Sequence, residues 1–147
     1  MKKVRPHAEQ TMGKVLGLAR QFLESHNVFA LDKECIANGF QMFCKCLVRR
    51  VEPGAAGNFI AQLPSVLHEQ LLAERVGPDV SINTVVAERL IRRAMGLKKG
   101  QESDALIALA ETLIFSISPG EVDAISSQLP TDWREVFRRA QSGEAAA

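Results

Sequence analysis

A duplication is the feature of this sequence that most constrains its fold. Pro53-Gly54 and Gln62-Leu63-Pro64 recur 66 residues later as Pro119-Gly120 and Gln128-Leu129-Pro130. The aligned positions around these motifs are Leu47 with Leu113, Val51 with Ile117, Phe59 with Ile125, Ser65 with Thr131, Leu67 with Trp133, Glu69 with Glu135, and Leu71 with Phe137. The pattern predicts two copies of one structural unit, and it specifies packing, not chemistry.

Composition and apolar spacing predict that this unit is helical. The 147 residues are 46% hydrophobic but only 5% aromatic, with no Tyr, and such a composition favours helices over a sheet. Apolar residues at steps of three and four predict one helix over 10–25 and a long amphipathic helix over 32–51. Pro53 suits the first turn of a short third helix, and Pro64 ends that helix before a fourth over 65–74.

The second copy predicts the same order of helices after a break at residues 77–79. Ser81 is the expected N-cap of its first helix. Ser118 and Glu121 have the spacing of a capping box, in which each residue caps the backbone of the other. A final helix over 131–140 is expected to point its bulky side chains, Trp133 and Phe137, inward.

These elements lead to one expected architecture. We predict an all-α fold of about eight helices, in which two tandem four-helix units pack as one pseudo-twofold bundle. The internal repeat halves span about 11–75 and 80–140, within a single domain over 1–147. Each half alone would bury too little apolar surface to offset its conformational entropy, so the two halves are expected to fold together.

Several segments of the second copy together carry a family pattern. They are Val85 to Leu90, Ala105 to Ile117, Ser118 to Glu121, Gln128 to Pro130, and Trp133 at a position the family fills with a bulky residue. Their order resembles the bacterial domain-of-unknown-function family 2267, over roughly 11–139. The first copy departs from the pattern at 44–46 and 57–58. The resemblance implies an α-helical repeat fold and brings no established reaction, substrate or cofactor.

No arrangement typical of an enzyme is present in the sequence. It lacks a Gly-rich phosphate loop, a nucleophile elbow and a His-Glu metal helix. The carboxylates of Glu102, Asp104 and Glu111 are expected on solvated helix faces, and the histidines are expected to be solitary; they are His7, His26 and His68. We therefore expect no enzymatic activity, no catalytic residues, no bound metal and no cofactor.

The cysteines raise a redox or metal-responsive function as a third hypothesis. Cys44-Lys45-Cys46 places a cation between two thiols, which can lower a thiol pKa. Residues two apart on a helix point about 200° away from each other, which disfavours a shared metal or a disulfide. Cys44 also aligns with Ala110 on the predicted core face, so the favoured interpretation is a small buried residue. The reactivity of these two residues and of Cys35 stays open at the level of sequence.

A cluster of cations is the candidate interaction site. It comprises Arg89, Arg92, Arg93, Lys98 and Lys99, and a second cluster of Arg134, Arg138 and Arg139 lies near the C-terminus. These cations make nucleic-acid binding the second hypothesis. Cations near helix C-termini also complement the helix dipole, and the net charge is only +1. The structural interpretation of both clusters is therefore favoured.

The leading hypothesis is a non-enzymatic module for binding another protein, or a scaffold. Its partner is an unknown protein or a second copy of the chain as a homodimer. No stretch reaches the ~18 apolar residues of a membrane span, and the N-terminal cations precede no apolar run. We expect no membrane partner and a cytoplasmic location. The sequence does not identify the partner, the oligomeric state or the functional surface.

Overall fold

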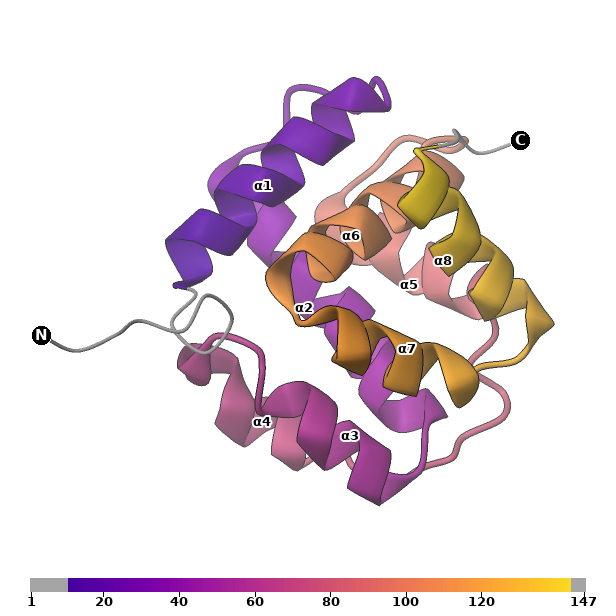
Figure 1. Cartoon of the computed structure of the whole chain (residues 1–147). Coiled ribbons are helices and arrows are strands. Elements are labelled where there is room, and N and C mark those ends of the chain that lie inside the picture. Colours follow the sequence, from indigo (N-terminus) through magenta and orange to yellow (C-terminus); the bar gives the residue numbers. More distant parts are fainter. Residues whose placement is uncertain (1–10, 144–147) are drawn as a thin grey trace, which may run out of the picture.

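The computed structural model describes residues 11–143, and this part of the chain is all-helical (Figure 1). Its elements are α1 (Met12–Ser25), α2 (Lys33–Arg50), α3 (Pro53–Ile60), the short 3-10 helix η1 (Ser65–Leu67), α4 (His68–Leu72), α5 (Thr84–Met95), α6 (Glu102–Ser116), α7 (Pro119–Ser127) and α8 (Thr131–Ser142). No strand occurs between residues 11 and 143. The predicted all-α fold of about eight helices is confirmed.

The long helices α2 and α6 organise the packing. In Figure 1, α6 lies between α1 and α8, both of which pack against it. Helix α1 contacts α6 more extensively than α2, and α5 contacts α2 more extensively than α6. The first helix of each half therefore lies mainly on the long helix of the other half. One cluster of buried apolar side chains runs through all of these contacts.

The start of α5 differs from the prediction. Its N-cap is Asn83, whose Oδ1 accepts a hydrogen bond from the N–H of Val86 at 2.9 Å. Ser81, the expected N-cap, instead donates its N–H and its hydroxyl to Oδ1 of Asp79, at 3.0 and 2.6 Å. The Ser81 prediction was wrong because Asp79 engages the Ser81 hydroxyl in a turn two residues before the N-cap, and Asn caps a helix as well as Ser does.

The capping box of α7 is completed by the other half of the chain. Ser118 is the N-cap, as predicted, and its Oγ accepts from the N–H of Glu121 at 3.2 Å. The N–H of Ser118, however, donates to Oε1 of Gln62 at 2.8 Å. A side chain from the first Gln-Leu-Pro motif therefore fills the role expected of Glu121, and it ties the two halves together at a partly buried helix start.

The two Gln-Leu-Pro motifs form corners that are stabilised in the same way. Leu63 and Leu129 are both buried. The carbonyl of Leu63 accepts a hydrogen bond from Nε2 of His68 at 2.7 Å, and that of Leu129 accepts from Nε of Arg134 at 2.8 Å. A side chain five residues further on thus satisfies the carbonyl that precedes each proline, although the residue types differ.

The expected fourth helix over 65–74 is shorter in the structure. The chain forms η1 and then α4, which ends at Leu72, whereas α8 continues to Ser142. Beyond α4 the chain returns to α2, where the N–H of Asp79 donates to the carbonyl of Arg49 at 2.8 Å. The boundary was missed because this tertiary contact, and not local sequence, sets the path after Leu72. No helix in the described range is long and apolar enough to cross a membrane.

Candidate interaction groove

A groove lies along α2 and is bordered by α4 and α5. Its larger hollow has a volume of about 270 Å³ and is lined by Asn38, Gln41, Met42, Lys45, Leu67, Gln70, Leu71, Glu74 and Ala94. A smaller hollow of about 170 Å³ is lined by Met42, Lys45, Cys46, Arg49, Ile82 and Leu90. Because both hollows share Met42 and Lys45, they adjoin each other. We call the two together the α2 groove.

One face of α2 forms the length of this groove. The lining residues of α2 recur at steps of three and four and therefore share a face; they are Asn38, Gln41, Met42, Lys45, Cys46 and Arg49. Ile36, Phe40 and Phe43 belong to the core face and are almost fully buried. The amphipathic pattern predicted for this helix thus gives it one core face and one groove face.

The two halves differ at the border of the groove. At the 66-residue offset, Leu67 aligns with Trp133 and Leu71 with Phe137. Helix α8 packs closely on α6, and its two aromatic side chains are buried, with Trp133 against Phe43 of α2. Helix α4 carries the smaller leucines and makes far less contact with α2. Leu67 and Leu71 are buried too, so smaller side chains fill the equivalent positions, and the hollow lies beside α4, between it and α5.

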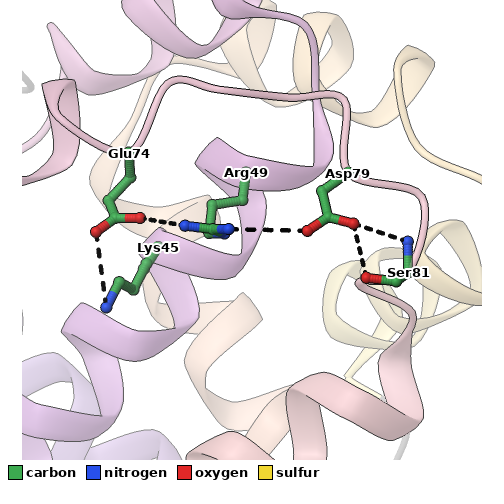
Figure 2. A network of polar contacts seen from close by, with 5 residues as sticks. All are labelled: Lys45, Arg49, Glu74, Asp79 and Ser81. Carbon is green, nitrogen blue, oxygen red and sulfur yellow. Dashed lines mark hydrogen bonds and ion pairs between the residues drawn. The ribbon is translucent and has the colours of Figure 1, made fainter.

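A network of charged side chains joins α2 to the segment that follows α4, as Figure 2 shows. Arg49 Nη1 lies 2.6 Å from Glu74 Oε1, and Arg49 Nη2 lies 3.8 Å from Asp79 Oδ2. Lys45 Nζ lies 3.8 Å from Glu74 Oε2. The hydroxyl and N–H of Ser81 lower the pKa of Asp79, which favours its ionised form. These partly exposed pairs are individually weak, but together they hold the segment against α2.

The predicted cations lie on α5 and in the turn that follows it. Arg89 and Arg93 are exposed, Arg92 is half-buried, and Lys98 and Lys99 are exposed. Within residues 11–143, none of these five side chains makes a hydrogen bond or an ion pair. The cluster thus presents charge that its described neighbours do not neutralise through direct contact.

Helix geometry divides this cluster between two sides of α5. Leu90 and Ala94 line the α2 groove. Arg93 lies three residues after Leu90 and is therefore next to the groove face, whereas Arg89 lies about 100° from Leu90 around the helix and outside the groove. Arg92 points toward the other side.

The pKa of Glu102 is lowered chiefly by backbone N–H groups, its own and that of Gly100, and further by Arg92 and Lys99.

The second basic cluster is engaged within the fold. Arg134 caps the Leu129 carbonyl. Arg138 Nη2 and Arg139 Nε lie 2.8 and 3.0 Å from Oε2 of Glu135. Hydrogen bonds from the two arginines lower the pKa of Glu135 to about 2. These cations therefore have structural roles, and the structure separates the two clusters that looked alike in the sequence.

A buried ionisable pair was not foreseen. Glu111 was expected on a solvated helix face and His26 was expected to be solitary. Instead, Nε2 of His26 lies 2.8 Å from Oε1 of Glu111, and the two side chains are 6% and 8% exposed. The pair joins the end of α1 to α6. The prediction for Glu111 was wrong because α1 from the other half of the chain covers this side of α6.

The burial of Glu111 should make the stability of the protein depend on pH. Burial raises the pKa of Glu111 above its ordinary value of 4.5, and hydrogen bonding to His26 opposes the rise. The folded state therefore favours the protonated form of Glu111, which stabilises the protein fully below pH 4.5. This stabilisation is lost as the pH rises through the raised folded-state pKa. We expect Glu111→Gln to flatten this decline in urea unfolding measured across pH. Exposed Glu69→Gln is the control, and an unchanged profile in Glu111→Gln would contradict the assignment.

The thiols are protected by their surroundings. Cys44 and Cys46 are buried, and burial raises the pKa of both, that of Cys46 to about 12, although Lys45 and Arg49 act in the opposite direction. A hydrogen bond with Asp32 raises the pKa of Cys35. Thiolates are the reactive form of cysteine, so this geometry gives the thiol hypothesis no support. In residues 11–143, no three His, Cys, Asp or Glu side chains gather to hold a metal.

The described part of the chain is all-helical and has a groove along α2, the long helix of its first half. The chain belongs to the family described as uncharacterized conserved protein (DUF2267), whose model matches residues 40–136. The matched range includes the walls that α4 and α5 contribute to the groove. The predicted family resemblance is confirmed. No curated protein and no solved structure matches the chain.

Proposed function

We propose that the protein is a non-enzymatic interaction module that binds a partner protein in the α2 groove. The observation that carries this proposal is the open groove along α2, between α4 and α5. Apolar side chains line the groove together with the amides of Asn38, Gln41 and Gln70. A concave apolar surface with a few polar groups is the usual form of a binding site.

Two further expectations accompany this proposal. The internal repeat, about 11–75 and 80–140, is supported by the equivalent capping of Leu63 and Leu129. The partner is an unknown protein of the cytoplasm, with a homodimer as the alternative form of the same interaction. A single pseudo-twofold bundle agrees with the contacts of α1 with α6 and of α5 with α2.

Affinity capture with matched variants tests the proposal. Ala94→Trp places a bulky side chain in the groove, whereas Val85→Trp places the same side chain at an exposed position of the same helix. Both variants are first checked for unchanged unfolding. We expect one stoichiometric protein to be retained from the host lysate by wild type and Val85→Trp and lost with Ala94→Trp. Equal recovery with all three baits would contradict the groove as the binding site.

Nucleic-acid binding is the second candidate, because the cations of α5 and the following turn have no ion-pair partner in the described residues. If it holds, Arg92→Glu/Arg93→Glu is expected to abolish salt-sensitive binding, since each lost phosphate contact weakens affinity and flattens its salt dependence. Fluorescence anisotropy of labelled DNA and RNA over a salt series measures both effects. Lys14→Glu/Lys33→Glu is the matched charge control. Wild-type protein that does not bind nucleic acid even at low salt would exclude this candidate.

A further inference from the structure

We infer that two copies of this chain form a dimer by exchanging α1, so that α1 of each copy packs on α6 and α2 of the other. We call this assembly the exchange dimer. Its hinge is the segment from Phe29 to Leu31, in the connection between α1 and α2. The inference goes beyond the proposed function, because it uses the contacts of α1 and not the α2 groove.

The two halves of the chain already exchange their first helices. Helix α1 contacts α6 more extensively than α2, and α5 contacts α2 more extensively than α6. If the two halves were separate chains, this arrangement would be a domain-swapped dimer, in which equivalent elements pack on the partner. The surface that receives α1 is thus one that this fold fills with a helix from the other half, and α1 of a second copy presents the same side chains to it.

All of the contacts that hold α1 can form between two copies. The buried side chains of α1 are those of Val15, Leu16, Ala19 and Leu23. Near the end of α1, the rings of Phe22 and Phe115 have centroids 5.2 Å apart, and His26 pairs with Glu111. The N–H of Val28 donates to the carbonyl of Leu23 at 2.9 Å, so this residue stays with α1 and the hinge begins after it. The exchange keeps these contacts and forms them between chains instead of within one.

The connection between α1 and α2 is strained at Ala30. It contains two residues with positive φ, Asn27 at 65° and Ala30 at 64°. Asn tolerates this conformation, whereas the Cβ of Ala lies too close to the following carbonyl oxygen. The connection between α5 and α6 also has positive φ at two residues, but these are Gly96 and Gly100, which adopt it without strain. Opening the first connection into an extended hinge releases its strain, and strained short hinges favour domain swapping.

Phe29 gives the hinge an exposed apolar surface. Its side chain is 56% exposed, and the neighbouring Ala30 is exposed as well. In a symmetric exchange the two hinges cross near the twofold axis, so each hinge residue lies close to the same residue of the other copy. We expect the two Phe29 rings to pack against each other there, since aromatic pairs stabilise buried contacts beyond the area they cover. A second copy therefore covers the surface that a single copy leaves in water.

Sedimentation of the full chain at increasing concentration tests the inference, with two substitutions at Ala30. Ala30→Gly relieves the strain of the closed connection in both copies, so it should lower the association constant by about tenfold or more. Ala30→Pro fixes φ near about −65°, which excludes the closed connection and should raise the dimer fraction. Phe29→Ser should lower the dimer fraction, whereas Val85→Ser, at another exposed apolar residue, should leave it unchanged.

Cross-linking between chains tests the exchange itself. Phe22→Cys and Phe115→Cys are placed in separate chains, each with Cys35→Ser to remove the partly exposed native thiol. The two variants are refolded together at high concentration and treated with a short bis-maleimide. Because the exchange brings the two substituted positions together across chains, we expect a covalent heterodimer in larger amount than either variant gives alone.

Each of the other outcomes would overturn the inference. They are a chain that stays monomeric at every concentration, a mixture of variants that gives no excess of cross-linked heterodimer, and equal dimer fractions in Ala30→Gly and Ala30→Pro. Ala94→Trp fills the α2 groove and is expected to leave the exchange dimer intact. Loss of the dimer in this variant would assign self-association to the groove and overturn the exchange, whereas groove-dependent capture of a different protein tests the proposed function independently.

Discussion

Replacing Trp133 with Ala is expected to lower the free energy of unfolding by about 3–5 kcal/mol. The side chain is fully buried, and its ring lies 6.3 Å from that of Phe43. Its Nε1 donates to the carbonyl of Ile82 at 2.9 Å. The substitution leaves a cavity where α8 packs and removes the hydrogen bond to the segment before α5. Urea unfolding followed by circular dichroism measures the loss, because Trp133 is the only Trp in the chain.

Trp133→Phe separates the two contributions. It keeps an aromatic ring in the core but removes the indole N–H, so the buried carbonyl of Ile82 loses its partner at a cost of about 1–3 kcal/mol. We expect the stability of this variant to lie between those of wild type and Trp133→Ala. A loss in Trp133→Ala below about 1 kcal/mol would show that α8 does not depend on this contact.

Gly77→Ala is expected to destabilise the fold by about 3 kcal/mol, at the upper end of the range for overpacking. A Cβ at this position would collide with the carbonyl oxygen of Arg49 and lie 2.5 Å from that of Val51. Both atoms belong to backbone that ends α2, so they cannot move aside as a flexible side chain would. The segment would have to leave α2, breaking the Asp79 hydrogen bond and the charge network.

Gly17→Ala is the matched control for this prediction. Gly17 lies within α1, and a Cβ there would meet nothing within 4 Å. Replacing a helical glycine by Ala stabilises a helix by about 0.5–1 kcal/mol. Opposite signs for the two variants are therefore expected in the same unfolding assay. A Gly77→Ala protein as stable as wild type would mean that the segment does not need its close approach to α2.

Local signals in the sequence located most of the helices. The apolar steps within 10–25 and 32–51 correspond to α1 and α2, and Pro53 and Pro119 each occupy the first turn of a helix. These signals work because they depend on residues only three or four apart. The sequence failed where a distant group intervened, as when Gln62 took the capping role expected of Glu121.

The candidate site was only partly within reach of the sequence. The five cations of α5 and its turn were named, but none of them lines the two hollows, and only Arg93 lies next to the groove face by helix geometry. The groove itself was missed. The pairs Leu67 with Trp133 and Leu71 with Phe137 show that the first copy has smaller side chains there, but both leucines are buried, so this difference alone does not reveal the groove.

Periodicity and the prolines determined by themselves that this chain is helical, where most of its helices begin, and which face of α2 enters the core. Only the tertiary structure decided which helices meet, because packing joins residues that are far apart in sequence. It placed α1 over α6 to bury Glu111 with His26, and it left a groove beside α4. Burial and open space are properties of neighbouring surfaces, which no local sequence pattern specifies.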